Sequence, residues 1–296
     1  MERKIAVIGG DLRSKYLANM LAQENTVITY GQELENEVKL EAMKIDNLKS
    51  AIELSNIIIG PIPFSKDGKF VYAQFSRQNI LIKDIIQYAK GKTIIAGAVK
   101  EDVYDLAVKS DVHIIELMKN ESLTVLNTMA TAEGTLEVAM KRTKRTIHGS
   151  KVLVLGYGRV AKVVARAFDA LSADVTCAAR KQEAFAWIEV DGYKKTNINE
   201  LEDNLSAYDI IINTPPTMIL TKNRLQKLKK DCLVIDLASY PGGVDQDAAK
   251  ESGINYEWAL GLPGKVAPIT AAEHIKKTLD NILKEVNVWQ YFKHLY

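Results

Sequence analysis

The chain has 296 residues, of which 47% are hydrophobic and 26% charged, and its formal net charge is +2. This composition is typical of a folded globular protein with room for two domains, and it excludes a disordered chain. The small net charge gives no reason to expect nucleic acid or a membrane as a partner. Two cysteines exclude a disulfide scaffold, and the four histidines show no metal-ligand spacing. With no signal peptide and no apolar run of roughly 18 residues, we expect a cytoplasmic protein that binds no metal.

The first apolar run, 5–8, ends in Gly9, Gly10 and Asp11, the pattern of a buried strand followed by a glycine turn. The third small residue of a dinucleotide-binding turn is missing, and Asp11 would repel a phosphate. We therefore expect this turn to serve something other than a dinucleotide, with Arg13 at the next helix N-terminus pairing with a substrate carboxylate. The alternative is that Asp11 only caps the helix and Arg13 is a surface residue.

Further short apolar runs alternate with helical patterns such as 80–89 and 103–108. This alternation predicts a parallel sheet in a doubly wound α/β domain of Rossmann or flavodoxin type. Ligands bind at the carboxyl ends of such strands, and the loop 60–68 follows one of them. Ser65 and Lys66 in that loop are expected to meet a small acid, although loops rich in proline and glycine are often only turns. The runs are 26–30, 56–59, 93–96 and 113–117.

Residues 126–147 carry a long helical pattern that leads directly into another strand. We predict a helix that crosses from a substrate-side domain, 1–125, to a second domain, 148–268, with a cleft at the junction. Thr131 and Glu133 are expected at the start of this helix, facing the cleft. For Glu133 the alternative is a carboxylate that is there because the helix dipole favours it.

The second domain opens with a buried strand, 152–155, followed by a G-x-G-x-x-A turn and a helix. Gly156 permits the tight turn, Gly158 lets a pyrophosphate approach the backbone, and Ala161 lets the helix pack close to the strand. The helix N-terminus offers N–H groups to the phosphates. Strand, turn and helix in this order predict a dinucleotide-binding Rossmann domain. The cofactor-binding residues predicted here are Gly156, Tyr157, Gly158, Arg159, Val160 and Ala161.

The next strand, 174–179, is followed by Arg180 and Lys181, where an NAD-preferring site usually places an acid. A guanidinium pairs with a 2′-phosphate and stacks on adenine, whereas a carboxylate would repel that phosphate. Arg180 follows Gly156 at the expected interval. The sequence therefore favours NADP over NAD.

Later strands end in loops that normally pass the ribose and nicotinamide of the cofactor, although plain turns would look similar. The loop 261–270 is expected to precede a helix capped by Thr270, and the helix 269–296 is expected to pack back on the first domain. Trp289, Tyr291 and Phe292 would anchor its end or take part in a homo-oligomer contact. The cofactor-binding residues predicted from these loops are Asn213, Thr214, Pro215, Leu237, Ala238, Ser239, Val266 and Pro268.

Several short motifs are spread along the chain: Gly9-Gly10-Asp11-x-Arg13, Thr131-Ala-Glu-Gly134, Thr146-Ile-His-Gly-Ser150, Gly156-Tyr-Gly-Arg-Val-Ala161, Asn213-Thr-Pro-Pro216, Asp236-Leu-Ala-Ser-x-Pro-Gly-Gly243 and Gly261-Leu-Pro-Gly-Lys-Val-Ala-Pro268. Together they resemble the dipicolinate synthase A-subunit family of spore-forming bacteria. The two-domain plan is also similar to that of formate/glycerate and alanine dehydrogenases. The resemblance implies an NADP-linked oxidation of a dihydrodipicolinate-type intermediate of the lysine pathway to dipicolinate during sporulation. It also implies a second protein, the flavoprotein B-subunit of dipicolinate synthase.

Such an oxidation removes a hydride and a proton from the ring. A dicarboxylate substrate requires cations, and we expect Arg13 and Lys265 there, although Lys265 could instead touch the cofactor's ribose or a phosphate. Glu133 is the candidate proton acceptor, with solvent as the alternative. Two other functions stay open: an NADP-dependent dehydrogenase of another small carboxylic acid, and a non-catalytic NADP-binding subunit of a complex. The predicted substrate side comprises Asp11, Arg13, Ser65, Lys66 and Thr131.

Overall fold

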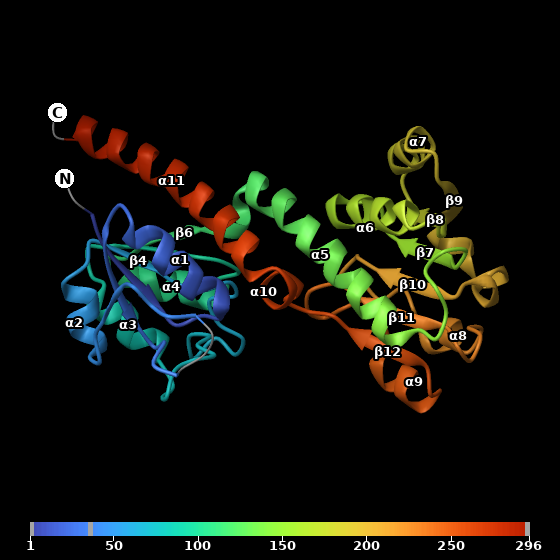
Figure 1. Ribbon diagram of the computed structural model, residues 1–296, viewed down its shortest axis with the longest axis horizontal. Coiled ribbons are helices and arrows are strands. Elements are labelled where there is room, and N and C mark those ends of the chain that lie inside the picture. The colour runs from blue at the N-terminus through green and yellow to red at the C-terminus, as the bar shows by residue number, and fades with distance from the viewer. Residues whose placement is uncertain (1–2, 35–37, 294–296) are drawn as a thin grey trace. The chain divides into compact units, whose positions relative to one another are not determined.

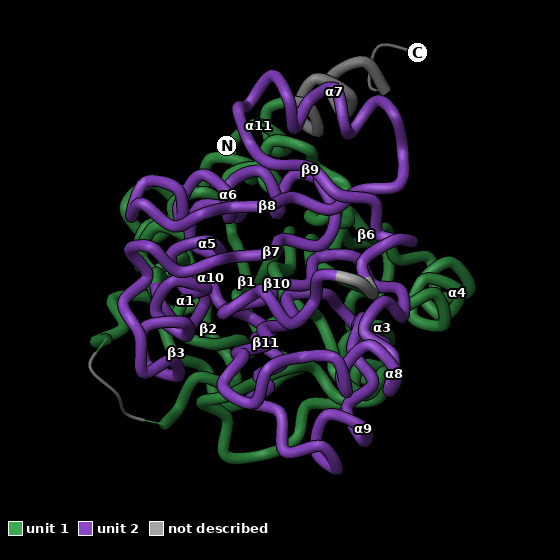
Figure 2. Tube along the Cα trace, turned by 90° about the vertical axis from the view of Figure 1, so that its right-hand side faces the viewer, with its two compact units in different colours: residues 1–126, 267–296 green, residues 127–266 purple. Residues whose placement is uncertain are grey.

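The computed structural model describes residues 3–34 and 38–293, with side chains given for all of these except 202, 203 and 285–293 (Figure 1). Two compact units make up the chain, one formed by residues 1–126 with 267–296 and the other by residues 127–266 (Figure 2). The side chains of Trp289, Tyr291 and Phe292, predicted to anchor the end of the chain, lie outside the described residues.

Unit 1 is built on a parallel six-stranded sheet in the order β3-β2-β1-β4-β5-β6. This is the Rossmann order, so of the two predicted sheet types the Rossmann one is correct and the flavodoxin one is not. The central strands are buried on both faces, which explains their unbroken apolar sequences. The strands are β1 (Lys4–Ile8), β2 (Thr26–Tyr30), β3 (Met43–Lys44), β4 (Ile57–Ile59), β5 (Thr93–Ala96) and β6 (His113–Glu116).

Helices cover both faces of this sheet. The long helix α11 (Pro268–Lys293) packs on α1 (Leu12–Ala22), and its buried residues Ala272, Ile275, Leu279 and Leu283 recur at helical spacing. These residues share a core with Ile5 and Val7 of β1. The other helices of unit 1 are α2 (Leu48–Glu53), α3 (Ile82–Tyr88), α4 (Glu101–Lys109) and a 3₁₀ turn (Leu117–Lys119).

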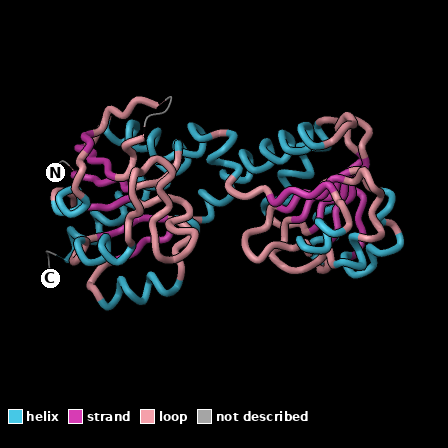
Figure 3. The backbone as a smooth tube through the Cα atoms, turned by 90° about the horizontal axis from the view of Figure 1, so that it is seen from below, coloured by secondary structure: helices cyan, strands magenta, loops and turns pink. Residues whose placement is uncertain are grey.

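Unit 2 repeats the Rossmann order in a second parallel sheet, β12-β11-β10-β7-β8-β9. Figure 3 draws the strands in magenta and the helices in cyan. The predicted fold class, two doubly wound parallel-sheet domains, is therefore confirmed. The strands are β7 (Lys151–Leu155), β8 (Asp174–Ala179), β9 (Lys194–Asn197), β10 (Ile210–Asn213), β11 (Leu233–Asp236) and β12 (Asn255–Trp258). The helices are α5 (Glu121–Arg142), shared with unit 1, α6 (Arg159–Ala170), α7 (Gln182–Val190), α8 (Lys222–Leu225), α9 (Gln246–Glu251) and α10 (Leu262–Val266), with 3₁₀ turns at Ile198–Asp203 and Leu205–Ala207.

Two strands, β3 and β9, were not predicted. Both lie at the outer edge of a sheet, and their residues Met43, Lys44, Lys194 and Lys195 are exposed. An edge strand with solvent on its faces has no apolar run, so the pattern that reveals the buried strands is missing.

The start predicted for the crossing helix is wrong. α5 begins at Glu121, and the Asn120 side chain caps it by accepting a hydrogen bond from the Leu123 N–H at 3.0 Å. Thr131 and Glu133 therefore lie in the middle of the helix, where the helix dipole does not explain Glu133 either. Glycine is favoured at position 134 of this helix because a methyl group added there would lie only 3.0 Å from the Leu262 side chain of α10.

The segment 261–270 is helical, not the predicted loop. α10 occupies its first half, and α11 begins at Pro268, so Thr270 is not the N-cap. Proline is well suited to the first helical position because its missing N–H would have had no intrahelical partner there. The prolines that suggested a loop therefore lie in the first turns of two helices.

Replacing Leu279 by alanine should destabilise unit 1, because this α11 side chain is 0% exposed. Truncating a buried leucine leaves a cavity and typically costs about 2–5 kcal/mol. Urea unfolding followed by circular dichroism measures the loss. Ile269→Ala on the same helix is the matched control, since Ile269 is 48% exposed. Equal stability of the two variants would contradict this packing.

Candidate functional site

The G-x-G-x-x-A turn of unit 2 lies where the strand order reverses, between β7 and β10. Gly156 has a positive φ of 88°, and an added methyl group would lie 2.7 Å from the Thr214 hydroxyl oxygen. Thr214 in turn donates a hydrogen bond to the Leu155 carbonyl at 2.8 Å. Both the backbone conformation and the contact with the residue after β10 therefore require glycine at this position.

Gly158 is different, because a methyl group added there would meet no atom within 4 Å. It is the N-cap of α6 and, being glycine, has no side chain to accept a hydrogen bond from the first N–H groups. The positive end of the α6 dipole therefore favours an anion here, and the space over Gly158 is open to one. Ala161 is fully buried against the sheet, as close packing of helix and strand requires.

A buried carboxylate, which the sequence patterns did not reveal, holds the neighbouring loops in place. Asp236 at the tip of β11 is 0% exposed and accepts hydrogen bonds from the Asn213 side chain at 2.7 Å. It also accepts from the backbone N–H groups of Ala238 at 3.0 Å and Gly243 at 2.8 Å. The only sequence signal is an acid ending an otherwise apolar strand.

Some of the loop residues predicted to bind the cofactor form hydrogen bonds within the protein that hold these loops in place. Asn213 is fully buried, and besides Asp236 it donates to the Pro215 carbonyl at 3.0 Å, so its amide nitrogen holds the loop. The Ala238 carbonyl accepts from the Trp258 indole N–H at 2.8 Å. Leu237 is partly buried in the core, whereas Ser239 is exposed. Val266 ends α10 in unit 2, while Pro268 begins α11 in unit 1.

A cavity of about 330 Å³ lies between the first turns of α6 and α7. It brings together four residues predicted for the cofactor, Tyr157, Gly158, Arg159 and Lys181. Val160, half-buried, packs against the core of unit 2, and Arg180 is exposed at the end of β8 without lining this cavity. Lys162 and Trp187, which were not predicted, also line it.

The glycine turn of unit 1 is built differently. Asp11 caps α1 by accepting from the Arg13 N–H at 3.1 Å, and its carboxylate pairs with the Arg13 guanidinium at 2.7 Å. Arg13 also donates to the Ile62 carbonyl and is 7% exposed, so it is not a surface residue. The cap that the alternative predicted for Asp11 is therefore present, but Asp11 also pairs with Arg13 and so does more than cap the helix. The Asp11 carboxylate therefore neutralises the Arg13 charge that was expected to pair with a substrate carboxylate.

The space over this turn is filled by the chain itself. Gly10 donates to the Tyr72 carbonyl at 2.7 Å and accepts from the Gln74 N–H at 2.9 Å. A methyl group added at Gly9 would lie 2.9 Å from the Tyr72 carbonyl oxygen. Unlike Gly158, these glycines face protein, which agrees with the expectation that this turn serves no dinucleotide.

The loop predicted to bind a small acid is held together by hydrogen bonds between its own residues. Ser65 is buried, donates to the Phe70 carbonyl at 2.6 Å and accepts from the Gly68 N–H at 2.8 Å. Backbone N–H groups of Phe70 and Lys69 lower the pKa of Asp67 in the same loop. The Lys66 ammonium lies 4.1 Å above the Tyr72 ring. Ser65 therefore shapes the loop, and Lys66 is the exposed cation beside it.

The remaining predicted residues lie on α5 and α10. Thr131 donates to the Asn127 carbonyl of its own helix at 2.9 Å. Glu133 and Lys265 are exposed, and neither forms an ion pair or hydrogen bond with a residue that the structure describes. Because Gly134 packs against Leu262, the helices that carry Glu133 and Lys265 are in contact.

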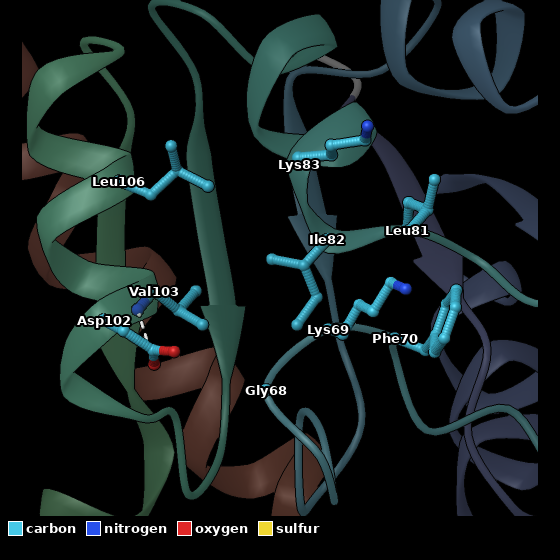
Figure 4. A pocket seen from close by; sticks show the side chains of 9 residues that line it. All are labelled: Gly68, Lys69, Phe70, Leu81, Ile82, Lys83, Asp102, Val103 and Leu106. Atoms are coloured by element: carbon cyan, nitrogen blue, oxygen red, sulfur yellow. Dashed lines mark hydrogen bonds between the residues drawn. The ribbon is translucent and has the colours of Figure 1, made fainter.

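A second hollow, of about 510 Å³, lies in unit 1 between the loop 68–70 and the starts of α3 and α4 (Figure 4). Leu81, Ile82, Val103 and Leu106 give it an apolar lining, and Asp102 accepts from the Val103 N–H at 3.0 Å. None of the predicted site residues lines it. The cavity of unit 2, which is lined by residues predicted to bind the cofactor, is therefore the better candidate for the functional site.

Elsewhere in the described ranges, no cluster of three or more His, Cys, Asp or Glu side chains is placed to hold a metal. Nor does any helix in those ranges have both the length and the hydropathy needed to span a membrane.

Alanine substitutions at the two glycines of the turn should affect different properties, namely stability at Gly156 and dinucleotide binding at Gly158. Gly156→Ala should lower the free energy of unfolding by about 1–2 kcal/mol or more, because its left-handed backbone disfavours a side chain. Gly158→Ala should leave stability unchanged but weaken dinucleotide binding, because the methyl group enters the space left for the pyrophosphate. Urea unfolding and calorimetric titration with NADP measure the two effects. Undiminished NADP binding by Gly158→Ala would contradict this assignment.

Asp236→Asn should destabilise unit 2 and weaken dinucleotide binding, because an amide cannot accept from all three donors that the carboxylate serves. Leaving buried donors unsatisfied costs about 1–3 kcal/mol. The same two measurements apply. The matched control is Asp247→Asn, at an exposed position on α9. A variant indistinguishable from this control would refute the role given to Asp236.

Comparison with known proteins agrees with the motifs. The family model for the N-terminal domain of the dipicolinate synthase A-subunit matches residues 4–118, and that of shikimate / quinate 5-dehydrogenase matches residues 137–257. The second match supports an oxidoreductase with a nicotinamide cofactor. An L-alanine dehydrogenase structure, 13% identical and covering 96% of this chain and 90% of its own, shares the fold with a TM-score of 0.66.

Two relatives match nearly end to end. The crystal structure of the dipicolinate synthase A-subunit from Bacillus halodurans has a TM-score of 0.87 and 30% identity, covering 95% of this chain and 97% of that chain. The dipicolinate synthase A-subunit of Bacillus subtilis (strain 168) is 32% identical over 286 residues, which are 96% of each chain. Sequence motifs, fold and both relatives agree that this chain belongs to the dipicolinate synthase A-subunit family.

Proposed function

We propose that this chain is an NADP-linked oxidoreductase that converts a dihydrodipicolinate-type intermediate into dipicolinate. The observation that carries the proposal is the open space over Gly158, which adjoins a cavity with Arg159 and Lys181 in its lining. Membership of the dipicolinate synthase A-subunit family supports the substrate class.

The residues of unit 2 fit a nicotinamide dinucleotide. Gly158 and the first N–H groups of α6 would hold the pyrophosphate, and the loops after β10 and β11 would flank the nicotinamide half. Arg180 and Lys181 follow β8, and no acid stands there to repel a 2′-phosphate. These features support NADP over NAD.

The chemistry requires a hydride and a proton to leave the dihydro ring, which then becomes aromatic. When bound, the cofactor supplies the acceptor for the hydride. The protein orients the ring and provides a route for the proton, and we propose Glu133 as the acceptor because its exposed carboxylate has no partner among the described residues. We propose Lys265, which is exposed on the neighbouring helix α10, as a further contact to the substrate.

Both relatives are named as the A-subunit of their enzyme, which indicates that those proteins have a partner subunit. We propose that this chain likewise acts with a flavoprotein subunit during sporulation. A chain that binds NADP but leaves the chemistry to its partner is the competing possibility, and the assay below separates the two.

The purified chain, given freshly generated dihydrodipicolinate-type substrate and NADP, should produce reduced nicotinamide absorbance and dipicolinate in equal amounts. Omitting substrate is the control for cofactor reduction by contaminants. If the chain binds NADP tightly but gives no turnover, even with the flavoprotein present, the oxidoreductase assignment is wrong and the chain is a binding subunit only.

Arg180→Glu should shift the cofactor preference towards NAD. A carboxylate at the tip of β8 repels a 2′-phosphate and accepts from a ribose hydroxyl, so the NADP to NAD affinity ratio should fall roughly 10- to 100-fold. Titrations with both cofactors measure the ratio. Arg166→Glu, an equal charge change at an exposed position on α6, is the control. An unchanged ratio would show that Arg180 does not contact the cofactor.

A further inference from the structure

The cavity between α6 and α7 contains a lysine that sequence reasoning had not connected with the cofactor. Lys162 comes from the first turn of α6, one residue after Ala161, and it lines the cavity together with Lys181 and Arg159. Among the described residues, Glu183 is the single carboxylate in this lining. Lys162 and Lys181 against this one carboxylate give the described lining a net positive charge that favours an anion.

The Lys162 ammonium is held in place without being neutralised. It lies 4.2 Å from the centroid of the Trp187 ring and 5.5 Å from that of Tyr157. A cation over an aromatic face is attracted to the ring but keeps its charge. Among the described side chains, no carboxylate forms an ion pair with Lys162. The charge is therefore fixed in position before any ligand arrives.

The aromatic walls are themselves braced. The Tyr157 hydroxyl donates to the Asp191 carboxylate at 2.6 Å, which ties the glycine turn to the end of α7. Burial and Asp191 raise the pKa of Tyr157, so its hydroxyl stays protonated and keeps this hydrogen bond. Trp187 stands on α7 and is 50% exposed, which leaves part of its ring facing the cavity.

The anion is inferred from the position of the cavity. Gly158 borders it on one side, and on the other side Lys181 follows β8, the strand tip beside which a Rossmann domain holds the adenosine ribose. A phosphate on that ribose distinguishes NADP from NAD. We propose that Lys162 is a specificity-determining residue that binds the 2′-phosphate of NADP together with Lys181. This inference rests on the proposed function, because it assumes that unit 2 binds a nicotinamide dinucleotide.

The test compares the full chain with Lys162→Gln, titrated separately with NADP and NAD while tryptophan fluorescence is recorded. The partly exposed Trp187 lies in the cavity wall, so a ligand there should quench its emission. Loss of a charge-assisted contact should weaken NADP binding about 10- to 100-fold, whereas NAD binding should change less than about twofold. Lys162→Arg, which keeps the charge, should retain most of the preference.

Arg166→Gln is the matched control, because it removes one positive charge from an exposed position of the same helix outside the cavity. It should leave both affinities unchanged. Equal weakening of NADP and NAD in Lys162→Gln, or no weakening, would overturn the role of Lys162 while leaving the proposed function standing. If the unmodified chain binds neither cofactor, both the proposed function and this inference are wrong. Urea unfolding of each variant confirms that affinities are compared between equally folded proteins.

Discussion

The buried Asp236 carboxylate is the interaction on which the candidate site depends. A charge removed from water is costly unless donors surround it, and Asp236 receives donors from Asn213, Ala238 and Gly243. These contacts hold the tips of β10 and β11 and the loop that follows β11 in one arrangement. Gly243 has no room for a side chain, since an added methyl group would lie 2.3 Å from the Asn213 amide nitrogen. The loops beside the glycine turn are therefore positioned before a cofactor binds.

The two units show that the same strand order can carry two differently built glycine turns. Each has a glycine turn after its first strand and the same strand order, yet only the turn of unit 2 is open above its second glycine. In unit 1 the segment around Tyr72 covers the turn, and Asp11 both caps the helix and pairs with Arg13. Fold alone does not assign function, and the difference lies in what fills the space over the glycines.

Sequence patterns predicted the buried strands well, because a strand covered on both faces needs a continuous apolar run. They failed for the edge strands β3 and β9, whose exposed residues carry no such run. They also failed at the start of α5 and at α10, where glycine and proline suggested breaks. Gly134 lies within α5 against Leu262, and Pro268 occupies the first position of α11. The helical state of Gly134 and of Pro268 therefore depends on packing and on position in the helix as well as on the helix propensity of each residue.

The sequence by itself determined two parallel-sheet domains, a second glycine turn suited to a dinucleotide, and cations after β8, because these features depend on residues that are neighbours along the chain. Only the tertiary structure decided that Asp236 holds the loops, that Arg13 is paired, and that Lys162 of α6 meets Trp187 of α7. Such contacts form because elements pack against one another, or because one turn of the chain folds in a particular way. No spacing in the sequence encodes them, so the open glycine turn was predictable and the charged cavity beside it was not.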